Sequence, residues 1–513
     1  MSESREKKGR ATPLDGLVQP HIIEAIATSL DNSVEFNCFL DAVPRSLWTP
    51  ALTAFVDVTT VAPSSVYDDW PYLILCETDL SPTVVGMLVQ TLPLRLLMGF
   101  ECTIYEAAPL VQLVPSLGPA LSSIILAFDD TIMVDGQGQT IADLLLQQCP
   151  RMTHILIHAV FNNNNNNNEE RVELSNLLAV VAHPRVEQLL LSLHDVHATP
   201  RLGHYLASWL LRAPSTSLIL RNIIHMDDDA AMAFCDALQA NTTLTELVLS
   251  RVANLVDLRG RTLPTSLQHL EWATRVGAPD VDDATIEHLA IAVGSTRLKH
   301  FGCCVFGRVA QCPAAASMLA QLQSLDVIAL PADGVQALIA GLSTVPALTT
   351  LALQKSQMTS EDDAVQLMDA LATSCPLLSR LNLNEHAMGY DGVAAVLAAA
   401  PRLPQLTSLD VSPKFNVMTL PELLYILMEL VVAGRHVREL YVKTVMRQMT
   451  VNGVRAPLSD GKKVKRAVLR ALAMIHDVPF VLNQFPANVE PHVVDALGAT
   501  AERADRCQLY LNF

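Results

Sequence analysis

The stretch from residue 215 to residue 249 decides the fold of this chain. It contains Leu218-Ile-Leu-Arg-Asn222, then the segment 227–240, and closes on Leu244-Thr-Glu-Leu-Val-Leu249. Alternating apolar residues predict a strand at each end, and the helical spacing of apolar residues between them predicts an amphipathic helix. Leu218 and Leu247 occupy the same position of one short phrase, 29 residues apart. A repeat of this period predicts a solenoid, a stack of identical units.

The phrase, Leu-x-x-Leu-x-Leu or a close equivalent, recurs along most of the chain. A strand and a helix cannot bury a core alone, so neighbouring units must stack. Connections that pass through helices force the strands to be parallel. The clearest copies start at Leu244, Leu348, Leu378 and Leu406. Less regular copies start at Leu121, Met152, Val186, Ser215, Leu267, Leu298, Leu322 and Val437, with weaker candidates at Leu52, Trp70 and Thr91.

Two segments carry a resemblance to the leucine-rich repeat family. They are Leu381-Asn-Leu-Asn-Glu-His386 with the helix that follows it to Ala400, and the segment 240–249. The repeats resemble the long, helix-containing class typified by ribonuclease inhibitor, over roughly residues 90–445. The resemblance implies an α/β horseshoe with parallel strands on the concave face, helices on the convex face and helical caps. It implies no particular partner.

One departure from the family pattern concerns the turn after each strand. Five places after the second leucine, the family usually has an Asn or Cys that bonds the turn. The ladder of turn asparagines is largely missing here, which predicts irregular repeat geometry. The equivalent positions are Ile223, Val252, Ser356, His386 and Lys414.

Alternate strand positions point away from the core and line the predicted concave face. Their chemistry is mixed, with no dominant charge, as on a protein-binding surface. The net charge of −17 disfavours nucleic acid and anionic membranes as partners. We therefore expect a protein partner on this face. The predicted contact residues are Arg221, Glu246, His269, Glu271, His300, Asp326, Gln354, Arg380, Asn382, Asn384, Asp410, Glu439 and Tyr441.

The composition favours a globular protein inside the cell. Of the 513 residues, 50% are hydrophobic and 17% are charged, which excludes a disordered chain. Residues 1–10 are charged with no apolar segment behind them, so we expect no secretory signal, and no apolar run suits a membrane span. The ten cysteines follow no disulfide or zinc spacing. These features predict a cytoplasmic or nuclear location.

The N-terminal segment, residues 1–50, has a different pattern from the repeats at 51–445. Short helical runs within 14–30 and at 34–43 are followed by a third that starts at Pro44 and contains Trp48, an order similar to an F-box. That resemblance implies docking on the adaptor subunit of a cullin-type ubiquitin ligase; the alternative is a helical cap that closes the solenoid. By resemblance the docking residues are Leu17, Ile22, Ile23, Ile26, Phe36 and Leu40.

Two further segments interrupt or follow the repeats. Seven asparagines, 162–168, predict a polar surface loop, because such a tract cannot contribute to a core. Residues 446–513 are predicted to form a C-terminal helical cap. Its basic amphipathic stretch 461–475 is either a solvated face or a site for an acidic partner.

No motif for catalysis, a cofactor or a metal occurs in the sequence. Phosphate-binding loops, H-E-x-x-H and paired C-x-x-C are absent, and His194 and His197 are interpreted as a surface pair. The sequence thus predicts a non-catalytic interaction scaffold. An alternative is a regulator of a small GTPase, similar to Ran GTPase-activating protein, in which Arg221 or Arg251 would neutralise phosphate charge.

Overall fold

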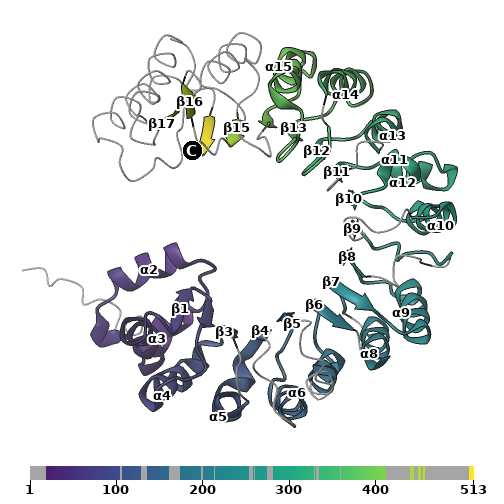
Figure 1. The fold of residues 1–513 in the computed structure, drawn as a ribbon. Coiled ribbons are helices and arrows are strands. Elements are labelled where there is room, and N and C mark those ends of the chain that lie inside the picture. Colours follow the sequence, from purple (N-terminus) through teal and green to yellow (C-terminus); the bar gives the residue numbers. More distant parts are fainter. Residues whose placement is uncertain are drawn as a thin grey trace, which may run out of the picture. The chain divides into compact units, whose positions relative to one another are not determined.

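The protein is described by a computed structural model and has two compact units, residues 1–237 (unit 1) and 238–513 (unit 2), each built of strand–helix repeats (Figure 1). Each unit is described by itself. The residues described are 19–103, 107–128, 136–160, 174–197, 200–212, 214–252, 258, 260–273, 281–327, 330, 334–358, 360–411, 439–443, 449–451, 454–456 and 508–512.

Unit 1 begins with helices and continues with alternating strands and helices. Its helices are α1 Pro20–Ala27, α2 Ser33–Ala42, η1 Arg45–Leu47, α3 Pro50–Val61, α4 Pro82–Thr91, η2 Leu92–Leu94, α5 Ala108–Leu117, η3 Gly118–Ala120, α6 Gln137–Gln148, η4 Leu178–Ala182 and α8 Pro200–Leu210. Its strands are β1 Val66–Asp69, β2 Tyr72–Leu75, β3 Leu97–Thr103, β4 Leu121–Phe128, β5 His154–Val160, β6 Gln188–His197 and β7 Ser217–His225.

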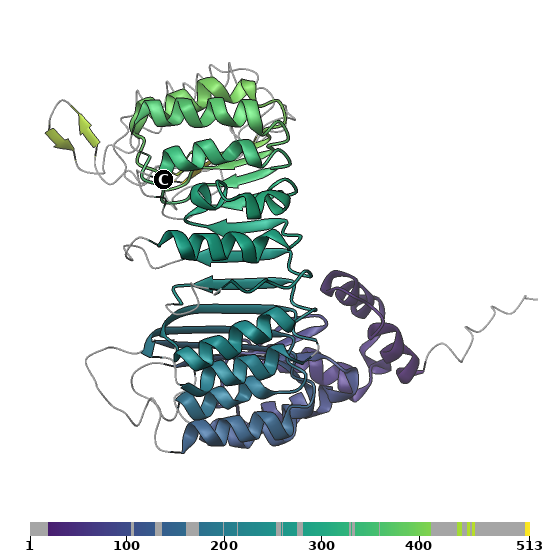
Figure 2. The same ribbon diagram turned by 90° about the vertical axis from the view of Figure 1, so that its right-hand side faces the viewer.

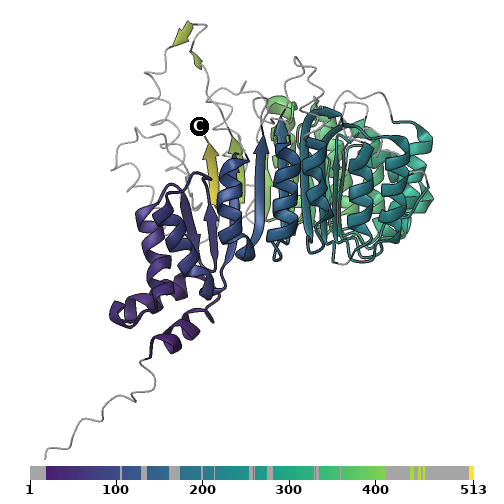
Figure 3. The same ribbon diagram turned by 90° about the horizontal axis from the view of Figure 1, so that it is seen from below.

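The strands of unit 1 form a sheet in sequence order. β1 pairs antiparallel with β2, and every later pair from β2 to β7 is parallel, as helical connections require (Figure 3). The second leucine of each phrase joins a buried ladder across the strands. Its rungs are Phe100, Ile124, Ile155, Leu189 and Leu218, each at most 2% exposed.

The N-terminal helices pack on the first strands of unit 1 through an aromatic cluster. The ring of Phe36 stacks on Trp70 with 3.8 Å between ring centroids, and both contact the ring of Phe55 edge to face. The Trp70 indole donates a hydrogen bond of 2.8 Å to the main-chain oxygen of Leu30. These contacts join residues on both sides of residue 50, where the sequence predicted a domain boundary. That boundary stays a prediction.

Unit 2 continues the same alternation after α9 Asp228–Ala240, which spans the division between the units. Its helices are α10 Asp283–Gly294, α11 Phe306–Val309, η6 Pro313–Ala315, α12 Ala316–Leu319, α13 Gly334–Gly341, η7 Leu342–Thr344, α14 Glu361–Ser374, α15 Gly389–Ala399 and η8 Ala400–Arg402. Its strands are β8 Glu246–Ser250, β9 His269–Ala273, β10 His300–Cys303, β11 Ser324–Asp326, β12 Thr350–Ala352, β13 Arg380–Asn382, β14 Ser408–Asp410, β15 Glu439–Lys443, β16 Met449–Val451, β17 Val454–Ala456 and β18 Gln508–Asn512.

Strands β8 to β15, followed by β18, are parallel neighbours, and the helices of unit 2 stack on one face of this sheet (Figure 2). The separate pair β16–β17 is antiparallel. Buried residues in register form the core ladder Leu247, Leu270, Phe301, Leu325, Leu351, Leu381 and Leu409. Both units therefore have the α/β architecture of a leucine-rich repeat solenoid.

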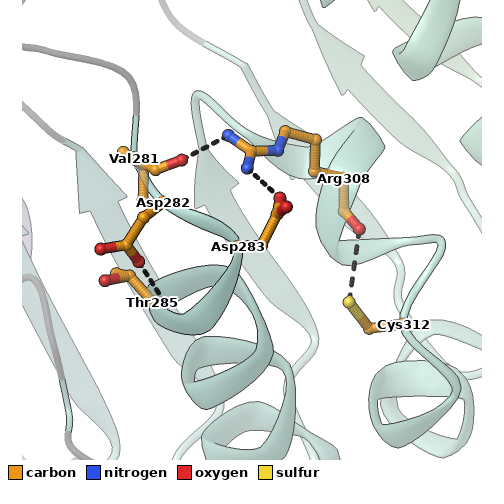
Figure 4. Close-up of polar contacts among 6 residues, drawn as sticks. All are labelled: Val281, Asp282, Asp283, Thr285, Arg308 and Cys312. Atoms are coloured by element: carbon orange, nitrogen blue, oxygen red, sulfur yellow. Dashed lines mark hydrogen bonds and ion pairs between the residues drawn. The ribbon is translucent and has the colours of Figure 1, made fainter.

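Successive helices of unit 2 are tied together at the start of α10. The Arg308 guanidinium in α11 donates hydrogen bonds of 2.6 Å to the main-chain oxygen of Val281 and to the carboxylate of Asp283 (Figure 4). The Asp282 carboxylate caps α10 by accepting the N–H of Thr285 at 2.7 Å. One arginine thus holds two neighbouring repeats.

The phrase predicted to start at Thr91 does not form a strand. Thr91 ends α4, a 3-10 turn follows, and β3 begins only at Leu97. Pro93 in this phrase suits the first turn of a helix and cannot donate to a sheet. Arg95, with φ 56°, then reverses the chain, and a register shift between Met98 and Gly99 aligns β3 with β4.

Several predictions concern residues outside those described, and they stay predictions. They are Leu17, Lys414, the asparagine tract 162–168 and the basic stretch 461–475. Among the helices described, none is both long and apolar enough to cross a bilayer.

Candidate functional site: a histidine and carboxylate cluster on the strand-lined face of unit 2

The helices of unit 2 lie on one side of its sheet, and we call the opposite side the strand-lined face (Figure 1). This face carries two rows of aligned positions. Alternation along a strand places residues two apart on the same face, and parallel pairing aligns them across strands. The first row is Glu246, His269, His300, Ser324, Thr350, Arg380, Ser408 and Glu439. The second row is Val248, Glu271, Gly302, Asp326, Ala352, Asn382, Asp410 and Tyr441.

A cluster of histidines and carboxylates forms where β9, β10 and β11 meet. The rings of His269 and His300 stack with 4.1 Å between centroids and 20° between planes. The Nε2 of His269 lies 3.4 Å from an Oε1 of Glu271, and the Nδ1 of His300 lies 3.0 Å from the Oγ of Ser324. All of these side chains are half-buried.

Gly302 makes room for the Glu271 side chain in this cluster. A Cβ on Gly302 would lie 2.9 Å from the Cγ of Glu271, closer than real Cβ contacts come, and 3.3 Å from its Cβ, which is a tight contact. Glu271 therefore lies over the glycine, in the row that leads to Asp326. A side chain at position 302 would displace it.

Burial controls the charge of two groups in the cluster. It is the main cause that raises the pKa of Asp326 to about 6; the Glu271 carboxylate acts in the same direction and His269 opposes it. Burial likewise lowers the pKa of His300, with His269 adding to the effect and Glu271 and Glu246 opposing it. His300 is therefore neutral near pH 7, with an imidazole nitrogen free of a proton.

Two buried polar atoms of the cluster have no hydrogen-bond partner among the described residues: the Nε2 of His300 and an Oδ1 of Asp326. Such atoms are rare in folded proteins because desolvation without compensation is costly. Donor atoms of His269, Glu271 and His300 all lie within 4.8 Å of one another. The described part of the chain holds no other group of three or more metal-ligating side chains this close together.

The sequence predicted these residues as surface contacts and predicted no metal site. His269 and His300 belong to different repeats, so no local motif joins them. Their equivalence in neighbouring phrases was the available signal, since both stand directly before the second apolar residue of the phrase.

The other predicted contact residues spread along the sheet. Arg221 in β7 of unit 1 and Arg380 are exposed, while Gln354, Asn382, Asn384 and Asp410 are half-buried. The side chains of Glu439 and Tyr441 lie outside the description, although their main chain belongs to β15.

Of the residues predicted to dock a ligase adaptor, the structure describes five, and three of these are core residues. Ile23, Phe36 and Leu40 are buried in unit 1, so their side chains are not available to a partner in this structure. Ile22 is half-buried and Ile26 is exposed. The side chain of Phe36 is buried because it packs in the aromatic cluster, which holds α2 against the first strands of unit 1.

The missing turn asparagine is replaced in different ways along the repeats. Ile223 and Val252 are buried apolar residues at that position. The hydroxyl of Ser356 is buried without a hydrogen-bond partner among the described residues. The Nε2 of His386 instead bonds the main-chain oxygen of Val411 in the following repeat at 3.0 Å.

In each unit, the strand order and the buried ladders give the α/β fold of a leucine-rich repeat solenoid. No protein-family model and no curated protein matches the sequence. The structure is similar to an internalin from Listeria monocytogenes, with 14% identity, coverage of 69% of this chain and 87% of that chain, and a TM-score of 0.32. It is also similar to a structure of the Rad7 and Elc1 complex in yeast, with 14% identity, coverage of 87% and 98%, and a TM-score of 0.40.

Proposed function

We propose that the chain is a non-catalytic scaffold that binds a protein partner on the strand-lined face. The observation that carries the proposal is the pair of aligned rows across β8 to β15, in which most side chains are polar and half-exposed. Parallel strands hold these side chains at a fixed spacing of about 4.8 Å. A rigid, preorganised surface of this kind loses little side-chain freedom when it binds.

The chemistry of the face favours a protein over other ligands. Among the described side chains of the two rows, the acidic residues Glu246, Glu271 and Asp410 outnumber the one guanidinium, that of Arg380. The face therefore offers no basic surface. Phosphate-rich ligands need a basic surface, and the chain as a whole has a net charge of −17. Helices α10, α13, α14 and α15 between the strands support placing the repeats in the long, ribonuclease-inhibitor-like class.

The test of this function is an affinity capture with two matched variants. Arg380→Glu combined with Asp410→Lys reverses charge on the strand-lined face, whereas Asp362→Lys changes an exposed residue on α14. We expect a specific partner to be lost with the face variant and kept with the helix variant. Equal recovery with both variants would exclude the strand-lined face as the binding surface.

A more specific form of the proposal is an adaptor that links a bound partner to a ubiquitin ligase through α1 and α2. Its support is limited to the order of these helices and to exposed apolar residues, Val34 at 71% and Ile26 at 39%. The test is capture of ligase subunits by the whole chain, with the double variant Ile26→Asp, Val34→Asp as comparison. Ligase subunits absent from both samples would remove the adaptor role and leave the scaffold role standing.

The alternative function is regulation of a small GTPase. It rests on two exposed arginines: Arg221, which lies in the middle of β7, and Arg251, which directly follows β8. Arg251 has a left-handed backbone, with φ 59°, and ends its strand there. GTP hydrolysis by candidate GTPases, measured with the wild-type chain and with Arg251→Ala, tests this alternative. Rates that do not respond to the wild-type chain would dismiss it.

A further inference from the structure

We propose that His269, Glu271 and His300 bind one divalent transition-metal ion, best matched by Zn²⁺, on the strand-lined face of unit 2. The three donors come from two adjacent repeats, and their ligand atoms lie within 4.8 Å of one another. The inference concerns the isolated chain and does not depend on the proposed protein partner.

One pair of donor atoms has the separation found along an edge of a tetrahedral zinc site. Zinc binds imidazole nitrogen and carboxylate oxygen at about 2.0–2.2 Å, which separates two ligand atoms by about 3.4 Å. The Nε2 of His269 and the Oε1 of Glu271 are 3.4 Å apart. This pair therefore has the separation of one tetrahedral edge, and the His269 ring must keep that separation when it turns.

His300 is oriented to offer its Nε2. Its Nδ1 lies 3.0 Å from the Ser324 hydroxyl, so a proton on Nδ1 can be donated to that oxygen. Metal-bound histidines typically have their second nitrogen held by a hydrogen bond of this kind. The Nε2 is buried and has no hydrogen-bond partner among the described residues. A metal ion bound by its lone pair would satisfy this atom.

Closing the site requires a rotation of one ring. The two imidazoles are stacked at 4.1 Å, and parallel rings cannot both direct a lone pair at one ion. The His269 side chain is 32% exposed and therefore has room to turn out of the stack. His300, held by Ser324, remains in place.

The charge of the neighbouring groups favours a cation at this position. Asp326 follows Glu271 and Gly302 in the second row, and its buried Oδ1 has no hydrogen-bond partner in the described residues. Two nearby carboxylates repel each other, and a divalent ion between them and the imidazoles relieves that repulsion. Because Gly302 has no side chain, Glu271 can lie across it toward this point.

The donor set selects among metals. Two imidazoles and a carboxylate suit Zn²⁺ and related transition metals, whereas Ca²⁺ and Mg²⁺ prefer oxygen ligands alone. Three protein ligands leave one tetrahedral position, which water can fill.

The test is calorimetric titration of Zn²⁺ into the full chain, freed of any purification tag and treated with chelator. We expect one ion bound per chain at the cluster. Co²⁺ in place of Zn²⁺ should give the visible absorption bands of a tetrahedral nitrogen–oxygen site. Both His300→Ala and Glu271→Gln should weaken binding at least about tenfold, since each removes a ligand.

Two further variants separate loss of a ligand from loss of fold. Gly302→Ala keeps every ligand but displaces Glu271, and should weaken Zn²⁺ binding while the circular dichroism spectrum is retained. Asn382→Ala, in the same row but two strands beyond Asp326, is the matched control and should leave affinity unchanged. A wild-type chain that binds no Zn²⁺, or a His269→Ala, His300→Ala double variant that binds as tightly as wild type, would overturn the proposal. Neither result would alter the scaffold role, which is tested by partner capture.

Discussion

The Nε2 of His386 lies 3.0 Å from the main-chain oxygen of Val411, and its Nδ1 accepts the N–H of Met388 at 3.2 Å. The acceptor role of Nδ1 places the proton on Nε2, which then donates to Val411. This fully buried imidazole ties β13 to the end of β14 in unit 2. His183 does the same in unit 1, where its Nε2 bonds the main-chain oxygen of Cys149 at 3.0 Å and its Nδ1 accepts from Arg185.

Replacing His386 should reduce the stability of unit 2. His386→Ala removes two hydrogen bonds and leaves a buried main-chain oxygen and N–H unpaired, which costs about 2–3 kcal/mol. His386→Asn restores the residue type of the family pattern and should recover part of the loss. Urea unfolding measures both variants, and equal stability of the Ala variant and wild type would contradict the bridging role.

Stability should fall as the pH drops below the ordinary histidine pKa of 6.5. Burial lowers the pKa of both His183 and His386, so each stays neutral in the folded chain at a pH where the unfolded chain is already protonated. The unfolded state then binds more protons, and acid favours it. Above pH 6.5 both states are neutral and this contribution to stability is complete.

The measurement is the urea midpoint from about pH 7.5 down to about pH 5.5. His386→Asn should show a shallower fall than wild type, because it lacks one of the titrating groups. Identical slopes for the two proteins would assign the pH dependence to other residues.

Truncating Phe36 should release the N-terminal helices from unit 1. Phe36→Ala removes the ring that stacks on Trp70 and creates a cavity, at a cost of about 3 kcal/mol. We expect faster proteolysis and faster amide hydrogen exchange within residues 20–47. The matched control on the same helix is Val34→Ala, whose side chain is 71% exposed and should be neutral. Unchanged protection in Phe36→Ala would show that these helices are not held by the aromatic cluster.

Arg308 should contribute to the stacking of α10 and α11. Arg308→Ala removes the bonds to Val281 and Asp283 and should cost about 1 kcal/mol, since the Asp283 partner is exposed. Arg308→Lys keeps the charge but cannot make both hydrogen bonds, so its stability should lie between those of Arg308→Ala and wild type. The exposed Arg297 is the control, and thermal unfolding compares the three variants. A loss of thermal stability for Arg297→Ala as large as that for Arg308→Ala would indicate a general charge effect.

The strand positions were predictable because the phrase is a local pattern. From Leu121 to Val437, each predicted copy lies on a strand, β4 to β15. The copy at Thr91 was misplaced, because a proline and the left-handed Arg95 delay the strand, and such turns are not visible in apolar periodicity. The burial of Phe36 was also missed, since its partner Trp70 follows 34 residues later.

The repeat, the parallel strands and the buried leucine ladder follow from the amino-acid sequence, because each depends on apolar spacing within a single unit. Which polar residues meet depends instead on how the units pack together. His269, Glu271, His300 and Asp326 lie in three repeats of unequal length, and their contact depends on the strand register. The same holds for His386 and Val411. Register is set by the packing of whole neighbouring units, and no single segment of the chain records it.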